Sequence, residues 1–429
     1  MPRPAGRMPH YSLIAKLGVL LAACGMIYAC ASMLFRVTTG QTDFSIFYRT
    51  AQAVQGGVAA EFYGQMDEVT DCHRCISPAG TMLFAYMPWL SLRGAALVWV
   101  AFNLGLLVLC AWCLWRLFGR LERQRRLYQR TWPWALVILA VLALDCLQVG
   151  QLSLLFTTCW LVALVADKGL LAASMLMLPA AIKLYPALLF ALPLGLRRWR
   201  EALWLPVAAV LVGLLLPWPL YGRHLLEMWA GFSHYMIFSS ESSRVVSMIN
   251  PYLPSNQSLD VTVLRYLADL PDFGRVYPWF PHLALSPAWA MRITLALKLG
   301  LLLVTGAAAW RLGSRAAVQP RWTALVMLGL WSVTLHLLLP ETKARYAVYA
   351  FPAWLPVLAL LTARHRHRRL PLRYGVLVGL GLVSQVQLMP PEVRIFGPSL
   401  VATAALWAVL LRVAWQAPAT AGTDQPAGR

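Results

Sequence analysis

Charged and amide side chains stand out in this 429-residue chain, because 59% of its residues are hydrophobic and only 13% are charged. Ionisable groups inside apolar runs are costly to bury in lipid and are therefore functional candidates by default. Those that could take part in chemistry fall in five short stretches. They are Asp43, the pair Gln148 and Gln151, Lys183, the triplet Asn256-Gln257-Ser258, and the group Glu341, Lys343 and Arg345.

Asp43 follows the first apolar run, in the stretch Gln-Thr-Asp-Phe-Ser-Ile-Phe-Tyr-Arg. A carboxylate in a partly apolar setting can act as a general base that takes a proton from a hydroxyl group. The same aspartate could instead cap the amphipathic helix that the next residues predict, because Asp is a favoured N-cap. The sequence leaves both interpretations of Asp43 open.

Lys183 is one of only five lysines among 37 basic residues, and it lies in Ala-Ala-Ile-Lys-Leu-Tyr-Pro between two apolar arms. A compact ammonium group suits an anion such as a lipid phosphate. The alternative is a lysine whose stem lies along apolar surface while its charge reaches the membrane interface. Lys298 lies in the middle of another apolar run, and it either faces a polar cavity or pairs with an acid.

The triplet Asn256-Gln257-Ser258 carries hydrogen-bonding side chains that could hold sugar hydroxyls. It also matches the N-glycosylation pattern, which matters only in a eukaryotic secretory route. A third interpretation is an ordinary cap at the start of a helix, where Ser and Asn are common.

The elements that must position these residues are membrane helices, because apolar runs near the length of a bilayer span, about 20 residues, recur along the chain. We expect an all-α polytopic bundle of about twelve membrane segments, with extracytosolic loops and no soluble domain. The expected segments are residues 11–35, 82–115, 132–147, 151–166, 169–182, 184–196, 201–220, 289–310, 322–339, 346–363, 374–389 and 396–414.

Short basic clusters between these segments set the expected orientation, because cytosolic loops carry an excess of Lys and Arg. This rule predicts cytosolic turns near 116–130, 197–200, 311–321 and 364–373, and two cytosolic termini. The loops 36–80 and 221–288 then lie outside, together with all five polar stretches, which predicts one polar cavity at the outer interface. Residues 1–415 form one expected domain, and the tail 416–429 is expected to be disordered.

Several other classes of function and site are disfavoured by the sequence. The formal charge of +20 is spread over short clusters and not over one continuous patch, which excludes nucleic acid as a partner. Cys72 and Cys75 are too few ligands for a structural zinc site. They form either a disulfide in an extracytosolic loop or two free thiols. No His, Asp and Glu cluster has the spacing of metal ligands, so we expect neither a metal nor another cofactor.

The order of several short motifs resembles glycosyltransferase family 87, whose members are polyprenyl-phosphate-sugar-dependent enzymes of the GT-C superfamily. The resemblance is clearest over about residues 40–270, and in the last four helices only Arg345-Tyr346 fits. The matching motifs are Asp43-Phe44-x-x-Phe47-Tyr48, Gly56-Gly57, Phe62-Tyr63, Tyr86-x-Pro88, Gly150-Gln151, Ala181-Ile182-Lys183-Leu184-Tyr185-Pro186 with the turn Arg197-Arg198-Trp199-Arg200, and Asn256-Gln257-Ser258-Leu259.

The resemblance implies a GT-C-type helical bundle and a mannosyltransferase-like activity. A hexose or pentose would move, with inversion, from a polyprenyl phosphate to a hydroxyl of a glycan, glycolipid or lipid acceptor. It implies that Asp43 is the general base. Lys183, Arg345 and Lys343 would bind the donor phosphate, and the sugar or acceptor would contact Tyr48, Gln151, Asn256, Gln257 and Ser258. The final outer loop has fewer aromatic and histidine residues than family members often carry, which weakens the assignment of the second phosphate-binding group.

The expected location is a bacterial inner membrane, with the active site facing the periplasm or exterior and membrane lipids as neighbours. The main alternative is a transporter or a flippase for lipid-linked substrates, which would also have many segments and an intramembrane lysine. Transporters usually bind substrate near the midplane of the bilayer. The polar groups here gather at one interface instead, which favours the transferase over both a transporter and a scaffold or sensor.

Overall fold

A computed structural model describes residues 13–40, 42–56, 63, 66–67, 72–73, 76–119, 125–238, 250–270, 272–314, 320–364 and 389–416. The described chain is almost entirely helical. The exception is a short antiparallel pair of strands, β1 (Met66–Asp67) and β2 (Cys72–His73).

Eight described helical stretches are long and apolar enough to cross a membrane. They contain α1 (Leu13–Arg36), α4 (Leu92–Gly119), α5 (Arg125–Val149), α9 (Trp199–Val210) with the π-helix η5 (Leu211–Leu215), α15 (Pro287–Gly313), α16 (Pro320–Leu338), the 3-10 helix η8 (Ala344–Ala350) with α17 (Phe351–Arg364), and α20 (Pro398–Gln416). The shorter apolar elements are α6 (Ser153–Val165), α7 (Gly169–Ile182), and the 3-10 helix η4 (Tyr185–Phe190) with α8 (Ala191–Gly195).

These elements confirm an all-α polytopic membrane protein, and they follow the expected segments in order. The segment expected at 374–389 is the exception, because residues 365–388 lie outside the described part of the chain. The number of segments that cross the bilayer completely stays a prediction.

The short helix α6 lies inside the protein, and α7 is buried over half of its residues. The 13 residues of α6 rise about 20 Å, whereas the hydrocarbon core is about 30 Å thick. Nearly every residue of α6 is buried, and α7 ends at Ile182, just before Lys183, which has an extended backbone. Helix ends at membrane depth are tolerated where protein covers them. The two hairpins can therefore carry polar residues into the bundle.

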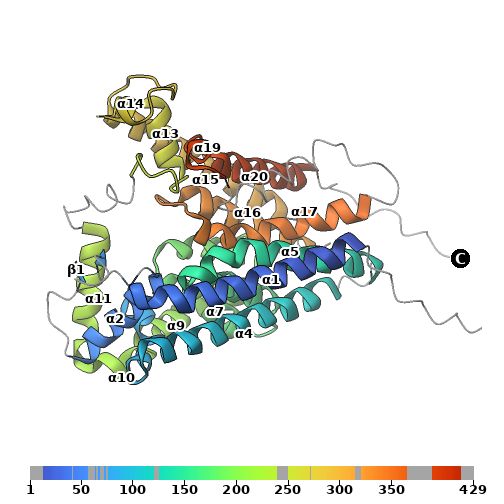
Figure 1. The fold of residues 1–429 in the computed structure, drawn as a ribbon. Helices are drawn as coiled ribbons and strands as arrows, with labels where there is room; N and C mark the ends of the chain where they lie inside the picture. Colours follow the sequence, from blue (N-terminus) through green and yellow to red (C-terminus); the bar gives the residue numbers. More distant parts are fainter. Residues whose placement is uncertain are drawn as a thin grey trace, which may run out of the picture.

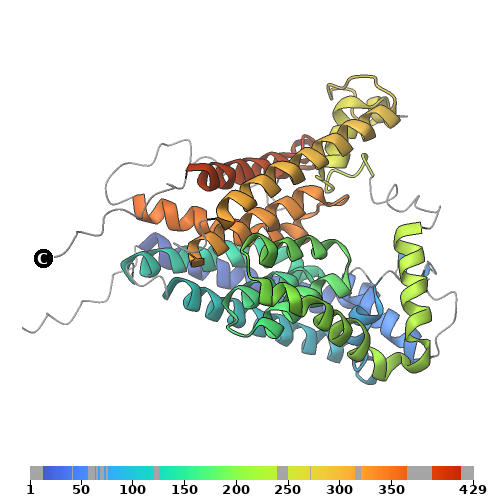
Figure 2. The same cartoon turned by 180° about the vertical axis from the view of Figure 1, so that it is seen from behind.

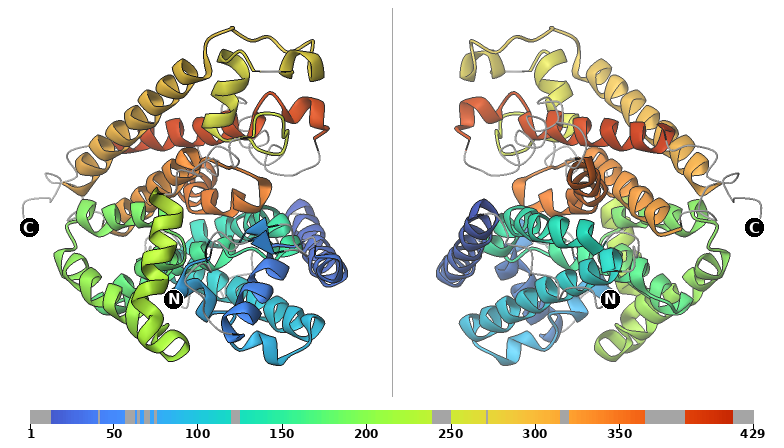
Figure 3. Two further views of the ribbon diagram at one scale, coloured as in Figure 1. Left: turned by 90° about the vertical axis from the view of Figure 1, so that its left-hand side faces the viewer. Right: turned by 90° about the vertical axis from the view of Figure 1, so that its right-hand side faces the viewer.

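The centre of the bundle is formed by α16 and α17, whose residues are mostly buried. Seen along the bundle, these two helices lie between a flank with α15 and α20 and a flank with α1 and α4 (Figure 3). The outer helices expose large apolar side chains, such as Leu303 on α15 and Val108 on α4. Such faces suit contact with lipid tails, whereas the buried central helices supply the packed core.

Basic turns gather at one end of the bundle. This end holds the beginnings of α1 and α5 and the ends of α4, α17 and α20 (Figures 1 and 2). Arg116 at the end of α4 pairs with Asp167, at 2.9 Å, in the turn between α6 and α7. The guanidinium of Arg197 lies over the ring of Trp310, 5.8 Å from its centroid. The turns that the sequence predicts as cytosolic therefore lie together.

The opposite end carries short helices where the sequence predicted loops. From the first loop come α2 (Asp43–Gln55) and α3 (Pro78–Met82). The stretch 221–288 is largely helical in its described parts, although it was expected to be a polar loop. Its helices are the end of α10 (Trp218–Tyr221), then α11 (Leu225–Ser233), α13 (Leu259–Leu267) and α14 (Phe273–Val276). Helix α19 (Pro391–Arg394) lies near α13 (Figure 1).

Arg265 holds α13 to its surroundings. Its buried guanidinium donates hydrogen bonds to the backbone oxygens of Pro251, Leu253 and Ile395. Burial lowers the pKa of Arg265 to about 10, so the side chain stays charged at neutral pH. Three carbonyl acceptors replace part of the lost hydration, and they connect α13 to the stretch just before it and to Ile395, which is 130 positions away.

Candidate functional site

Asp43 is the first residue of α2, and Thr42 caps that helix. The Thr42 hydroxyl oxygen accepts a hydrogen bond of 3.2 Å from the backbone N–H of Ser45. The interpretation of Asp43 as the N-cap is therefore wrong, because the preceding threonine already fills that position. The Asp43 side chain is only 15% exposed, and its carboxylate contacts groups from distant parts of the chain.

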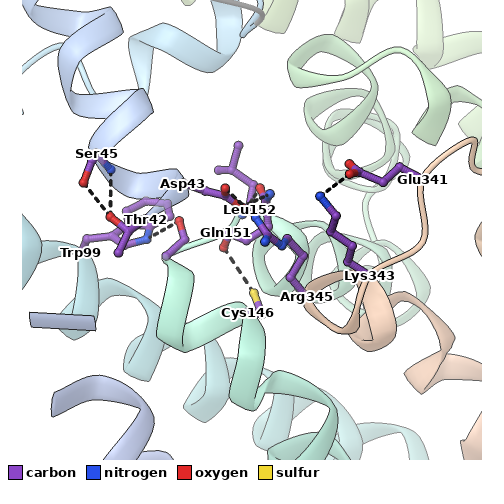
Figure 4. A network of polar contacts seen from close by, with 11 residues as sticks. Thr42, Asp43, Ser45, Trp99, Cys146, Gln151, Leu152, Glu341, Lys343 and Arg345 are labelled. Atoms are coloured by element: carbon purple, nitrogen blue, oxygen red, sulfur yellow. Dashed lines mark hydrogen bonds and ion pairs between the residues drawn. The ribbon is translucent and has the colours of Figure 1, made fainter. Parts of the chain in front are cut away.

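Arg345 and Gln151 hold the Asp43 carboxylate (Figure 4). The Nη1 atom of Arg345 lies 2.6 Å from both Asp43 oxygens, although the two residues are 302 positions apart. The Gln151 Nε2 donates a hydrogen bond of 2.7 Å to Asp43 Oδ2. Charge-assisted hydrogen bonds of this kind are short and strong. They fix the carboxylate between the turn that follows α5 and the start of η8.

The turn at Gly150 places Gln151 beside Asp43. Gly150 has a φ of +69°, which is a left-handed conformation that favours glycine. A Cβ atom at this position would lie 2.6 Å from the Cβ of Phe44. The carbonyl of Gly150 accepts a hydrogen bond of 3.1 Å from Trp99 Nε1. Glycine thus lets the turn pack directly on the residue next to Asp43.

Lys183 lies in an aromatic setting close to the same loop. Its Nζ is 5.6 Å from the ring centroid of Tyr346 and 5.9 Å from that of Tyr185. The hydroxyls of Tyr185 and Tyr349 are 2.8 Å apart, so they hold the start of η4 against η8. Because Tyr346 follows Arg345 in the chain, Lys183 and Arg345 reach neighbouring positions. Cation–π contacts hold an ammonium group in place while keeping its charge.

Lys343 belongs to the same loop, and it forms an ion pair with Glu341. Both side chains are about one-fifth exposed, at 22% for Lys343 and 21% for Glu341. Figure 4 shows Lys343 and Arg345 rising from one stretch of chain, the first toward Glu341 and the second toward Asp43. The three residues predicted to bind phosphate, Lys183, Lys343 and Arg345, are therefore brought to one region.

The triplet Asn256-Gln257-Ser258 is buried, and it forms hydrogen bonds with the loop that carries Lys343 and Arg345. Asn256 Oδ1 accepts a hydrogen bond of 3.0 Å from the backbone N–H of Thr342, and the N–H of Gln257 donates to the Thr342 carbonyl at 2.9 Å. Gln257 Oε1 accepts from the backbone N–H of Ser399 at 2.8 Å. Ser258 caps α13, because its hydroxyl accepts from the N–H of Val261. The interpretation of the triplet as a helix cap is thus confirmed for Ser258.

Lys298 pairs with an acid, which was one of its two expected roles. Its Nζ lies 2.6 Å from Asp260 Oδ2, and the two side chains are 19% and 5% exposed. Asp260 lies two residues after Ser258, at the start of α13. The ion pair therefore joins the membrane helix α15 to the segment that holds the loop of Lys343 and Arg345.

Tyr48 lies on α2, one helical turn and a residue beyond Asp43. Its side chain is 6% exposed, and its hydroxyl donates a hydrogen bond of 2.8 Å to the Leu90 carbonyl. This contact holds α2 against the turn that precedes α4. A direct role for Tyr48 in sugar or acceptor binding stays a prediction.

Asp145 is a site residue that the sequence reasoning missed. It lies on α5 and interacts electrostatically with Arg345, Asp43 and Arg36. Its Oδ2 is buried and has no hydrogen-bond partner among the described residues. The signal that could have found it is a single carboxylate inside the apolar run Leu-Ala-Leu-Asp-Cys-Leu.

Two other sequence predictions are not resolved by the site geometry. The disulfide predicted between Cys72 and Cys75 lies outside the described residues, since Cys75 and the side chain of Cys72 are not among them. Within the described ranges, no group of three or more His, Cys, Asp or Glu side chains could hold a metal ion. The expectation that the chain needs no metal or cofactor stays a prediction.

The sequence model of glycosyltransferase family 87 matches residues 77–340, which is more than half of the chain. No curated protein and no solved structure matches the chain. The chain therefore belongs to glycosyltransferase family 87, as its motifs suggested. The matched range includes Gln151, Lys183 and Asn256, whereas Asp43 and Arg345 lie on either side of it.

Proposed function

We propose that this membrane glycosyltransferase of family 87 moves a hexose or pentose from a polyprenyl phosphate to an acceptor hydroxyl, with Asp43 as the general base. One observation carries the proposal: a carboxylate lies close to cationic side chains that come from separate elements at one end of the bundle. Asp43 contacts Arg345 directly, and Lys183 and Lys343 lie in the neighbouring loop region. A transferase that releases a phosphate needs both kinds of group.

In the proposed reaction, the acceptor oxygen attacks the anomeric carbon of the donor sugar from the face opposite the phosphate. The bond between that carbon and the phosphate oxygen breaks, and its electron pair leaves with the polyprenyl phosphate. Asp43 takes the proton of the acceptor hydroxyl. A carboxylate offers about four lone-pair sites, and Oδ1 has only Arg345 as a described partner. This single displacement inverts the anomeric carbon.

The phosphate would lie among Lys183, Lys343 and Arg345. Negative charge on the leaving group grows as the sugar bond breaks, and prepositioned cations stabilise it most at that stage. The rings of Tyr346 and Tyr349 are stacked, with centroids 5.9 Å apart. We propose that the partly exposed Tyr346 packs against the sugar or the first part of the prenyl chain, whereas Tyr349, which is fully buried, supports it from behind.

The roles proposed for the remaining residues follow from their contacts. Gln151 orients Asp43 through its amide group. Asn256, Gln257 and Ser258 position the loop of Lys343 and Arg345, since their polar atoms bond to the protein itself. Their predicted contact with sugar hydroxyls would require these buried side chains to be uncovered. We therefore propose positioning as their main role.

The proposed orientation places this site on the periplasmic or exterior face of a bacterial inner membrane. The site lies at the end of the bundle opposite the basic turns, and such turns normally face the cytosol. Both termini would then be cytosolic. The acceptor would be a glycan, glycolipid or lipid exposed at the outer surface.

Transport of a lipid-linked substrate is less well supported by the contacts. Lys298 was the residue that suited an intramembrane transport site, and it is paired with Asp260. Helix α2, which begins with Asp43, lies at one end of the bundle (Figure 1), and Gln151 and Arg345 contact Asp43 there (Figure 4). A transporter is expected to bind its substrate near the midplane.

The test is transfer of radiolabelled sugar in membranes that contain the wild type or Asp43→Asn, with a panel of polyprenyl-phosphate sugars. We expect the wild type to use one donor and Asp43→Asn to be slower by about 10² or more, because the amide cannot accept the proton. Asp269→Asn is the matched control, since Asp269 is an exposed carboxylate on the chain after α13. A wild type that consumes no donor contradicts the transferase, and an active Asp43→Asn contradicts the base.

A further inference from the structure

Arg345 uses only part of its guanidinium group in the contact with Asp43. A guanidinium carries five N–H donors in a planar fork, yet Nη1 alone meets both Asp43 oxygens. Its Nε is buried and has no hydrogen-bond partner among the described residues. An arginine that fully satisfied one carboxylate would normally present two parallel N–H groups to it. Arg345 therefore keeps an unused N–H hydrogen-bond donor beside the site.

Asp145 has the complementary unused acceptor. Its Oδ2 is buried without a hydrogen-bond partner in the described part of the chain. Arg345 supplies compensating positive charge, because Asp145 interacts with the Arg345 side chain and with its backbone N–H. A buried carboxylate oxygen without a donor costs free energy, so such a group calls for an explanation.

The proposed chemistry makes this second carboxylate useful. In the structure Arg345 lies 2.6 Å from both oxygens of Asp43, where an acceptor hydroxyl must approach. Moving Arg345 away from Asp43 breaks this ion pair at a cost in free energy, because the donor phosphate is shared with Lys183 and Lys343 and compensates the guanidinium only in part. An alternate carboxylate removes most of this penalty, because one ion pair replaces another.

We propose that Asp145 is a positioning residue that takes over Arg345 when the acceptor hydroxyl binds Asp43. This inference rests on the proposed function, since it assumes that Asp43 is the general base. Arg345 would swing its guanidinium from Asp43 toward Asp145 while staying near the donor phosphate. Asp145 itself contacts neither the donor sugar nor the proton that is transferred. The other charged group that faces Asp145 is Arg36 at the end of α1.

The inference predicts a specific kinetic defect. Asp145→Asn keeps the shape of the side chain but removes the charge that would receive Arg345. We expect kcat to fall by about 10 to 10², the size of effect that misplacement of a reacting group produces. The KM for the donor should change by less than about threefold, because the cations around the phosphate stay in place. A residue that only stabilised the fold would lower the amount of folded protein and leave the kcat of the folded fraction unchanged.

A double-variant comparison separates action through Arg345 from an independent effect. If Asp145 acts through Arg345, Asp145→Asn should lower kcat little or not at all once Arg345→Gln is present. Multiplicative effects of the two substitutions would overturn the inference, as would an Asp145→Asn enzyme whose kcat lies within twofold of the wild type.

A second substitution covers the case in which Asp145→Asn does not fold. Asp145→Glu keeps the charge and moves it by about one bond length, roughly 1.5 Å. We expect this variant to have a kcat about tenfold below the wild type with an unchanged donor KM, and an equal kcat would overturn the inference. The wild type is assayed in the same membranes. If it transfers no sugar from any donor, the proposed function has failed, whereas an active wild type restricts any failure to the role of Asp145.

Discussion

Replacement of Gly150 by alanine tests whether the turn after α5 sets the geometry of the site. Gly150 has a φ of +69°, and a Cβ added there would lie 2.6 Å from Phe44 Cβ and 3.0 Å from Met33 Cε. The first distance is about 0.8 Å shorter than an ordinary contact of 3.4 Å. Phe44 follows Asp43, and Gln151 follows Gly150. The backbone shift that relieves the clash therefore moves Gln151 away from Asp43, to which it is hydrogen-bonded.

The expected magnitudes follow from this geometry. An alanine in the left-handed region costs about 1–2 kcal/mol, and overpacking of a filled site costs about 1–3 kcal/mol. We therefore expect Gly150→Ala to lose about 2–5 kcal/mol of stability. A displacement of 0.8 Å would lengthen the 2.7 Å bond between Gln151 and Asp43 to about 3.5 Å, which ends it as a hydrogen bond. Sugar transfer should fall by about 10².

The assay is sugar transfer per amount of folded protein, together with the temperature at which the protein aggregates in detergent. Gly105→Ala is the matched control, because Gly105 lies in α4 and a Cβ there meets nothing within 4 Å. This control should be as stable as the wild type or slightly more so, since alanine favours a helix. The reasoning fails if Gly150→Ala matches the wild type in transfer and stability, or if both variants lose activity equally.

Two further predictions concern the lysines. If Lys183 stabilises the leaving phosphate, Lys183→Met should lower kcat for transfer by about 10². Lys183→Arg keeps the charge and should retain more activity. Equal kcat values for Lys183→Met and the wild type in the transfer assay would contradict this role. Lys298→Met leaves Asp260, which is 5% exposed, without its partner, so the thermal stability should fall by an amount equivalent to about 3–5 kcal/mol. The double variant Lys298→Met with Asp260→Asn should recover part of that loss, and a single variant as stable as the wild type would show that the ion pair contributes little.

Parts of the candidate site could be predicted from local sequence. Asp43 and Lys183 were found because each is an ionisable group next to apolar runs, and burial of charge in a membrane is rarely accidental. Gly150-Gln151 was found as the tip of a hairpin. Each signal needed only a few neighbouring residues. The prediction that Lys183 and Arg345 belong to one region depended on the order of the segments, and the cation–π contact of Lys183 with Tyr346 agrees with it.

Other residues could not be placed without their distant partners. Asp145 carried the same local signal, a carboxylate inside an apolar run, but its relation to the site depends on Arg345, which is distant in sequence and is brought to it only by the fold. The triplet at 256–258 was open to three interpretations, namely sugar binding, an N-glycosylation site and a helix cap. The structure makes Ser258 a cap, and Asn256 and Gln257 bond to Thr342 and Ser399. Lys298 had two possible roles until Asp260 was found within 2.6 Å.

The sequence by itself therefore determined the membrane helices, their order and the turns that carry basic residues. The length of an apolar run and the charge of a turn are local quantities, and the bilayer acts on each segment separately. Only the tertiary structure decided which polar groups face one another. The pairing of Asp43 with Arg345, across 302 positions, depends on how α2, the turn after α5 and η8 pack, and no local pattern specifies that packing.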